Sequence, residues 1–517
     1  MRTIDKIAFT LVLLLAVSFI AMHFMQVEND DVGIRIASNW CKERDENFTN
    51  VSLCINKLNT PQAVIIQSLT LALFLFVIAL TVINMEWRVA AAMLSLVPLV
   101  IIGATPPQNL LNAVSWDLIV FLVGSMTLAG VLRELGVFRF IALKVLEVSK
   151  GNVIVLLVLL SSMAFLLSAA LGEVTSIIYV AMLVLEIGKI TRADVTPLII
   201  LSVLATNTGS AALPIGNPIG VYLLFQTDMS VSRFIKNAFP LALVNLVVLM
   251  VSVLLIERSA LRDIRDTLKA SKDKIEAYVT SRRIELSSTQ VANKTVKRIF
   301  IGLVLFVLFT STVALNDVIT GAISSALQMY IDPHAFLSFI PYIYIVAALI
   351  MAVPPSEVSK FVEKSVEWPS LLFFIFLFMF GYMLTYTGVM AKLAYGFLHI
   401  SRSSLALLSI VLFSSAFLSS VLDNLSVVVT FTPIAMVFNN IGLVSNSVFF
   451  ALLFGGVFGG NYTPIGSTAN IIAISLAEKR KIRVSWGRWL RIALIPTTLQ
   501  LLVSFTWLYA TTYALSW

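Results

Sequence analysis

Apolar stretches long enough to cross a membrane recur along most of this chain, separated by short polar segments. A transmembrane helix needs about 20 apolar residues to cross a hydrocarbon core of about 30 Å. Uninterrupted stretches of this kind occupy approximately residues 7–25, 63–83, 89–105, 116–132, 238–256, 299–319, 335–353, 371–385 and 492–513. The pattern therefore predicts an all-α polytopic membrane protein.

Two apolar blocks, 152–188 and 403–438, have lengths that fit neither one span nor two. A single helix over the first block would be about 55 Å long, and two spans would need about 40 residues plus a turn. We therefore expect two re-entrant hairpins, each made of two half-helices. Their tips are expected at Gly172–Glu173 and at Asp423–Asn424.

Two more spans, 197–225 and 447–477, contain helix breakers and small polar residues in their middle. The first carries the run NTGSAALPIGNP from Asn207, and the second carries GGNYTPIGSTAN from Gly459. Proline removes a backbone donor, and irregular backbone at membrane depth must be buried or line a cavity. We expect two broken helices here, which brings the total to about eleven transmembrane helices plus two hairpins.

Several short motifs occur twice at a nearly constant separation. Residues 114–117 pair with 366–369, residues 167–173 with 418–424, and residues 214–216 with 464–466. The offsets are 252, 251 and 250 residues. Because unrelated apolar helices would not keep this spacing, the sequence indicates an internal duplication.

Charge is sparse and lies mainly in loops. Of the 517 residues, 59% are hydrophobic and 12% are charged, against about 25% charged in soluble proteins. Eleven lysines and arginines face six acids in the connector 257–298, which is expected in the cytoplasm by the positive-inside rule. The net charge of +8 is explained in this way, without a nucleic-acid partner.

Arg2 and Lys6 place the N-terminus in the cytoplasm, and the C-terminus is then expected outside a plasma or inner membrane. With this orientation the two halves have inverted topology, which is a transporter architecture with its site at the midplane. The expected segments are an N-terminal helix and extracytoplasmic loop (1–62), a first repeat (63–256), a cytoplasmic linker (257–298) and a second repeat (299–517). If the first loop is extracytoplasmic, Cys41 and Cys54 are a disulfide candidate.

The hairpin tips and the helix breaks carry the candidate site. Half-helix N-termini offer N–H groups to an anion, and unwound carbonyls can coordinate Na⁺. The candidate binding residues are Ser168, Gly172, Glu173, Thr175, Asn207, Thr208, Gly209, Gly216 and Asn217 in the first half, and Ser419, Asp423, Asn424, Ser426, Gly460, Asn461, Thr463, Gly466, Ser467 and Asn470 in the second. Among them Asp423, Asn424, Asn461 and Gly466 are candidate Na⁺ ligands, and no other cofactor is expected.

Plainer interpretations exist for the same residues. The glycines could serve packing, Asp423 could be only a helix cap, and the serines could bond to their own helices. Asp423 is nevertheless the one charged side chain between residues 403 and 477. Its position at an expected hairpin tip favours a functional role.

The motifs SSVLDNLSVVVTFTP (419–433), GGNYTPIGSTANII (459–472) and VSWDLIVFLVGSMTLAGVLRELGVF (114–138) resemble the ion transporter superfamily. The resemblance covers residues 60–515 and the branch of arsenite permeases, citrate-type permeases and NhaD-type sodium/proton antiporters. It implies a dimerising scaffold domain and an elevator-type transport domain, so that the expected partners are membrane lipid, a small ion or anion, and a second copy of the chain. The first tip departs from the pattern, because it reads Gly172–Glu173 where many relatives have an Asp or Asn pair.

Two functions fit these features. The first is a secondary active transporter for a small anion or oxyanion, citrate-like or arsenite-like, coupled to Na⁺ or H⁺. The alternative is an Na⁺/H⁺ antiporter in which Asp423 and Glu173 exchange cation and proton. The sequence has no HExxH motif, Ser–His pairing or Asp dyad, so an enzyme is not expected.

Overall fold

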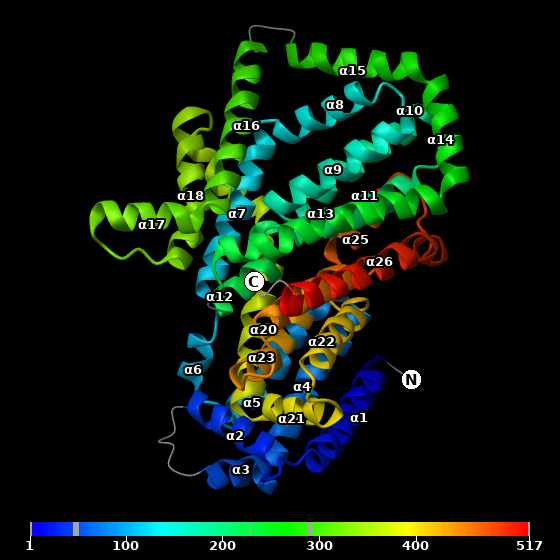
Figure 1. Ribbon diagram of the computed structural model, residues 1–517. Helices are drawn as coiled ribbons and strands as arrows, with labels where there is room; N and C mark the ends of the chain where they lie inside the picture. Colours follow the sequence, from blue (N-terminus) through cyan, green and yellow to red (C-terminus); the bar gives the residue numbers. More distant parts are fainter. Residues whose placement is uncertain (1–2, 45–50, 228, 288–291, 515–517) are drawn as a thin grey trace. The chain divides into compact units, whose positions relative to one another are not determined.

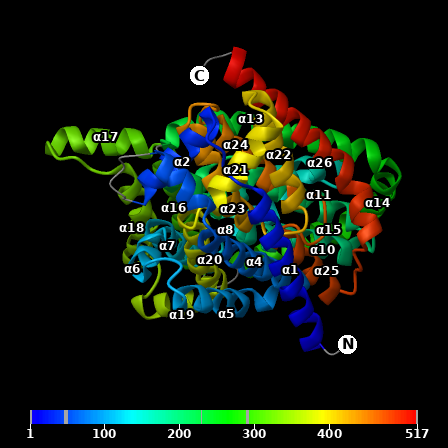
Figure 2. The same ribbon diagram turned by 90° about the horizontal axis from the view of Figure 1, so that it is seen from below.

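The computed structural model describes residues 3–44, 51–227, 229–287 and 292–514. Within these ranges the chain forms 26 α-helices and a few single-turn helical segments, with no strand (Figure 1 and, turned by 90°, Figure 2). The all-α fold class predicted from the hydrophobic pattern is confirmed. The predicted N-terminal, linker and C-terminal segments each include a few residues, 1–2 and 45–50, 288–291 and 515–517, that lie outside the described ranges.

The helices pack into two compact units. The first contains residues 1–115, 368–456 and 508–517, and the second contains 116–367 and 457–507. Each unit therefore combines segments from both halves of the sequence, so the packing units do not follow the order of the predicted repeats. The predicted division into consecutive segments remains a prediction.

The first unit is built from an N-terminal group of helices and a group from the second half of the chain. Its helices are α1 (Thr3–Phe24), α2 (Asp31–Glu43), α3 (Val51–Asn59), α4 (Pro61–Ile83), α5 (Arg88–Ile101), α6 (Pro107–Asn112), α20 (Trp368–Tyr386), α21 (Val389–Ile400), α22 (Ser404–Ser419) and α23 (Asn424–Asn440), with most of α24 (Ser447–Gly459).

Helices α2 and α3 form a small cap on this unit. The disulfide suggested by the sequence is present and joins Cys41 of α2 to Cys54 of α3. The Trp40 indole Nε1 donates to the carbonyl of Tyr386 at 3.2 Å, and Gln67 Nε2 donates to the carbonyl of Thr387 at 3.1 Å. The last carbonyls of a helix have no hydrogen-bond partner within it. The cap and α4 supply partners for those at the end of α20 and so fix the turn between α20 and α21.

The second unit holds the remaining helices. These are α7 (Trp116–Glu134), α8 (Val137–Ser149), α9 (Val153–Leu171), α10 (Glu173–Thr191), α11 (Thr196–Ser210), α12 (Pro218–Gln226), α13 (Val231–Ile256), α14 (Arg258–Ala270), α15 (Lys272–Ser287), α16 (Ala292–Ala314), α17 (Asn316–Leu327), α18 (Pro333–Met351), α19 (Val358–Ser365), α25 (Thr468–Lys479) and most of α26 (Trp486–Tyr509).

The connector between the halves is ordered as two helices, α14 and α15, that meet at Ser271. The apolar face of α14, formed by Leu261, Ile264 and Leu268, is buried. This face packs on α9, α10 and α13. The sequence pattern predicts a surface helix here, and the structure shows what that helix covers, namely the open end of the α9–α10 hairpin.

Nine helices in the described part of the chain are long and apolar enough to cross a membrane. They are α4, α7, α9, α10, α13, α16, α18, α20 and α26. The expected span at 89–105 is the 14-residue helix α5, which at 1.5 Å per residue is about 21 Å long and too short to cross alone. The finding supports a polytopic protein, and the expected total of about eleven spans stays a prediction.

The two predicted hairpins are pairs of helices that fold back on each other. Gly172 joins α9 to α10 with a φ of +90°, a backbone conformation that favours glycine, and the two helices pack together. Helices α22 and α23 likewise pack together about the turn at 420–423. Because α9 and α10 have 19 residues each, their length would also allow full spans, so a re-entrant path remains a prediction.

The helix boundaries repeat at the offsets seen in the motifs. Helices α7 and α20 both have 19 residues and begin 252 residues apart, at Trp116 and Trp368. Gly136 and Gly388, also 252 residues apart, both have positive φ and precede a short helix. The local structure thus agrees with an internal duplication, whereas the inverted orientation of the two halves is not addressed by it.

Packing between the halves is reciprocal. Helix α7 packs on α18 in the second unit, and α20 packs on α5 in the first unit. The α7–α18 contact is close: a Cβ on Gly124 would lie 2.7 Å from the Tyr342 ring, and the Tyr342 hydroxyl donates to the carbonyl of Val120 at 2.8 Å. Each half therefore supplies the packing partner for a helix of the other half.

Candidate functional site

The first helix break lies between α11 and α12 in the second unit. Helix α11 ends at Ser210, and Asn217 caps α12 by accepting from the amide of Gly220 at 2.8 Å. The Asn217 amide nitrogen also donates to the Ser210 carbonyl at 3.1 Å. A Cβ on Gly209 would lie 2.2 Å from the carbonyl oxygen of Phe165, and one on Gly216 would lie 2.4 Å from that of Ser210, so both positions require glycine.

The second break lies between α24 and α25. Ser467 caps α25 by accepting from the amide of Ala469 at 3.1 Å. The Asn470 side chain closes the loop, because its Nδ2 donates to the carbonyls of Gly460 and Thr463 at 2.8 Å each. The caps Asn217 and Ser467 stand 250 residues apart, which is the offset of the surrounding motifs.

Buried amide side chains join the two breaks. Asn207 Nδ2 donates to Asn461 Oδ1 at 2.8 Å and to Asn470 Oδ1 at 3.0 Å, and the Ser467 hydroxyl donates to Asn207 Oδ1 at 3.2 Å. All four side chains are at most 2% exposed. Because buried polar groups are costly without partners, this arrangement fixes the breaks to each other.

Gln500 of α26 extends this group. Its Oε1 accepts from Asn461 Nδ2 at 3.3 Å, and its Nε2 donates to Thr208 Oγ1 at 2.8 Å and to the carbonyl of Asn245 at 3.3 Å. We refer to Asn207, Asn461, Asn470 and Gln500 as the amide cluster. The carbonyl acceptors at Asn245, Gly460 and Thr463 decide which way each amide points.

Sequence reasoning missed Gln500, Asn245 and Trp489, whose indole donates to the carbonyl of Asn461 at 3.0 Å. Gln500 and Asn245 lie inside long apolar helices, α26 and α13, and are fully buried. For Gln500 and Asn245, the sequence feature that could have indicated a site is a single amide side chain within a long apolar span.

The first hairpin contributes hydroxyls next to the first break. Ser176 of α10 donates to the Ala164 carbonyl of α9 at 2.8 Å, and its oxygen lies 3.4 Å from that of Thr206. The Ser168 hydroxyl is fully buried and has no hydrogen-bond partner among the described residues. Thr175 and Glu173 are half-buried in the first turn of α10.

The second hairpin tip lies in the first unit. Asp423 caps α23, because its Oδ2 accepts from the Ser426 amide and hydroxyl at 3.3 Å each. The Ser419 hydroxyl lies 2.6 Å from Asn424 Oδ1 and 2.6 Å from the carbonyl of Gly456. Asp423 is therefore the N-cap of α23, as the plainer interpretation holds. An N-cap carboxylate can also bind a cation or a proton, so this structural role does not conflict with a role in transport.

The candidate residues thus form two groups. The second unit holds Ser168, Gly172, Glu173, Thr175, Asn207, Thr208, Gly209, Gly216, Asn217, Gly460, Asn461, Thr463, Gly466, Ser467 and Asn470, and the first holds Ser419, Asp423, Asn424 and Ser426. The proposed Na⁺ ligands are divided between the groups. Within the described residues no three His, Cys, Asp or Glu side chains gather as a metal site would require.

Nine membrane-length helices among the described residues, with two polar helix breaks joined by buried amides, define the class as a polytopic membrane protein. The model of the family described as "Citrate transporter" matches residues 75–455 and 345–516. The chain belongs to this citrate transporter family and is a secondary transporter.

The chain is similar to several known proteins. An uncharacterized transporter of Mycobacterium tuberculosis is 25% identical over 406 residues, covering 77% of this chain and 86% of that protein. The P protein of Homo sapiens is 24% identical over 501 residues, covering 85% of this chain and 59% of that protein. The crystal structure of the Alcanivorax borkumensis YdaH transporter aligns with a TM-score of 0.48 and 14% identity over 79% of this chain and 88% of that chain.

Proposed function

We propose that this protein carries a small carboxylate or oxyanion across the membrane, driven by Na⁺ or H⁺. The family model and the names of the relatives support transport of this general kind. The citrate in the family's description makes a carboxylate the first substrate to test.

The start of α10 is the observation that carries the anion assignment. Helices α12, α25 and α23 begin with side-chain caps from Asn217, Ser467 and Asp423. Helix α10 begins after Gly172, which has no side chain to cap it. The first N–H groups of α10 and its positive dipole end therefore favour an anion at the hairpin tip.

Glu173 gives a physical reason why anion binding at the hairpin tip would be coupled to binding of a cation or proton. Its carboxylate stands in the first turn of α10, where it would repel an incoming carboxylate. A proton or a Na⁺ ion at Glu173 removes this repulsion, so the anion and the cation bind best together. Ser168, Ser176 and Thr206 of the same unit supply neutral oxygens close by.

The amide cluster supports an elevator-type movement. The two broken helices are hydrogen-bonded to each other through fully buried side chains. If one break moved without the other, these amides would lose their hydrogen-bond partners, at a cost of about 1–3 kcal/mol for each unsatisfied group. Both breaks therefore move as one body in the proposed mechanism.

The test is uptake of radiolabelled citrate into proteoliposomes under an inward Na⁺ gradient, an inward H⁺ gradient, or neither, with arsenite as the second substrate. We expect one gradient to accelerate uptake at least tenfold in the wild type. Glu173→Gln, which is permanently neutral, should lose most of that acceleration. Glu186→Gln, an acid at the far end of α10 that pairs with Lys189 at 3.9 Å, is the matched control and should keep it. Equal uptake with and without gradients would contradict the proposal.

Na⁺/H⁺ antiport remains the second candidate, because the candidate residues include acids and neutral side chains but no basic one. Sealed liposomes with an internal pH dye and no organic anion separate the two. A rapid pH change after an external Na⁺ jump would favour antiport, and a flat trace from folded protein would favour the anion carrier.

A further inference from the structure

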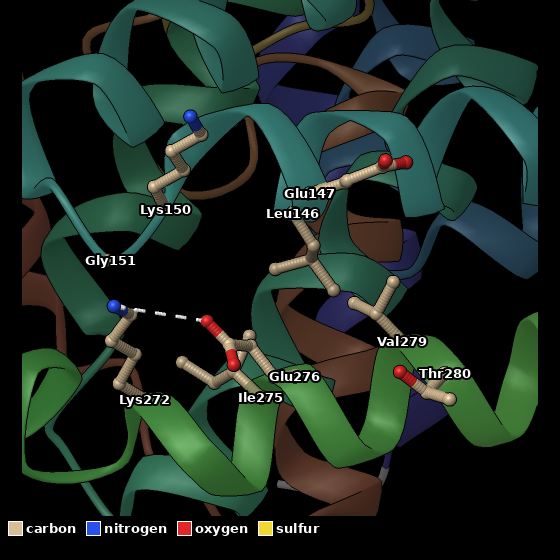
Figure 3. Close-up of a pocket in the computed structure, with 9 residues that line it drawn as sticks. All are labelled: Leu146, Glu147, Lys150, Gly151, Lys272, Ile275, Glu276, Val279 and Thr280. Carbon is tan, nitrogen blue, oxygen red and sulfur yellow. Dashed lines mark ion pairs between the residues drawn. The ribbon is translucent and has the colours of Figure 1, made fainter.

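A cavity of about 510 Å³ lies between α8 and α15 in the second unit, and none of the residues of the helix breaks lines it. Its walls are Leu146, Glu147, Lys150, Gly151, Lys272, Ile275, Glu276, Val279 and Thr280 (Figure 3). The volume is within the range of small-molecule sites.

The cavity is formed by the connector lying over the base of the first hairpin. Ile275 anchors α15 with 7% exposure, and α15 packs on α8 and α16. On the opposite wall of the cavity, Lys150 and Gly151 have φ values of +45° and +76° and turn the chain from α8 into α9. Two successive left-handed residues fix the direction in which the chain leaves α8.

The lining holds two lysines and two glutamates, and one of these lysines is left without an ion pair in the described part of the chain. Lys144 pairs with Glu147 at 3.0 Å, and Lys272 pairs with Glu276 at 3.9 Å. Lys150 has no carboxylate within ion-pair distance among the described residues. Figure 3 shows Lys150 and Lys272 on one side of the cavity, with the Glu276 carboxylate facing Lys272, and the Glu147 carboxylate on the other side. Because Lys144, which lies outside the lining, pairs with Glu147, the Lys150 ammonium is left without an ion pair among the described residues.

The rest of the wall is apolar. Leu146 is 2% exposed, Ile275 is buried, and Val279 is half-buried beside them. A ligand that fits has one negative charge for the lysine side and a hydrocarbon part for this surface. A free inorganic anion would leave the apolar part of the cavity uncovered.

We propose that this cavity binds the phosphate group of a monoanionic phospholipid. The phosphate pairs with Lys150 and Lys272, and the glycerol and first methylene groups contact Leu146, Ile275 and Val279. The lipid is favoured as the source because the connector 257–298, which supplies the α15 wall, is expected on the cytoplasmic side, where basic pockets bind anionic headgroups. The bound lipid would join the connector to the base of the α9–α10 hairpin, whichever substrate the transporter carries.

The test is lipid binding to the full-length, delipidated protein, measured by native mass spectrometry with added phosphatidylglycerol or phosphatidylcholine. The variant Lys150→Gln/Lys272→Gln removes both cavity lysines. The control Lys269→Gln/Lys274→Gln makes the same charge change on α14 and α15 at exposed positions that do not line the cavity. Thermal unfolding of both variants checks that they fold alike.

We expect one phosphatidylglycerol per chain, bound at least tenfold more tightly than phosphatidylcholine. The cavity variant should weaken it at least tenfold, and the control should stay within twofold of the wild type. Equal weakening in both variants, or no preference between the two lipids, would overturn the proposal. Displacement of the lipid by millimolar inorganic phosphate would also overturn it, because the site would then be one for a free anion.

Discussion

Replacing Asn207 by alanine is expected to abolish transport and to cause the largest loss of stability of any single substitution in the site. The change removes the donor to Asn461 and Asn470 and the acceptor for Ser467. Three fully or nearly fully buried polar groups then lose a partner. At about 1–3 kcal/mol for each unsatisfied group, the free energy of unfolding should fall by at least about 3 kcal/mol.

The matched control is Ser202→Ala on the same helix. Ser202 is fully buried, but its hydroxyl donates only to the carbonyl of Leu198 within α11, so its removal should be nearly silent. Thermal unfolding in detergent and uptake into proteoliposomes measure both variants. If Asn207→Ala matched Ser202→Ala in both measurements, the amide cluster would not hold the breaks together.

Asp423→Asn is expected to reduce transport at least a hundredfold while leaving stability nearly unchanged. Asparagine keeps an oxygen that can accept from the Ser426 amide, and it is as good an N-cap as aspartate. The substitution therefore removes the charge and retains the cap. A cation-coupled mechanism that uses this carboxylate should fail without it.

Asp423→Ala separates the two roles of this residue. It removes cap and charge together, so it should lose transport as Asp423→Asn does and also lose about 1 kcal/mol of stability. The measurements are again uptake and thermal unfolding. Normal uptake by Asp423→Asn, with loss only in Asp423→Ala, would make Asp423 a structural cap and remove it from the site.

Much of the helical plan was predictable because it depends on local sequence. The hairpin turn at Gly172 and the breaks at 211–217 and 460–467 lie where glycine, proline and polar residues interrupt apolar stretches. The helix caps Asn217 and Ser467 follow from residue type and position. The membrane course of the hairpins is not decided by length, since α9 and α10 are as long as full spans.

The pairing within the site was not predictable from one sequence. Asn207 and Asn461 are 254 residues apart, and nothing local shows that their amides meet. Gln500 lies in a predicted apolar span, and the mean hydropathy of such a span hardly changes with a single polar residue. The same limit applies to packing: the sequence does not show that α7 packs on α18 and α20 on α5, which interleaves the two halves.

We propose that substrate binds where the α9–α10 hairpin tip meets the helix breaks, since a Cβ on Gly172 would lie 3.9 Å from the Gly216 carbonyl, and cysteine labelling tests this placement most directly. The chain has two cysteines, and both are in the Cys41–Cys54 disulfide, so Thr463→Cys adds the sole free thiol, at a half-buried position of the second break. Ser325→Cys, at an exposed position of α17, is the control. We predict that citrate with its coupling cation slows maleimide labelling of Thr463→Cys at least fivefold and leaves Ser325→Cys unchanged. Unchanged labelling of Thr463→Cys, at a citrate concentration that saturates uptake by the same variant, would contradict the account.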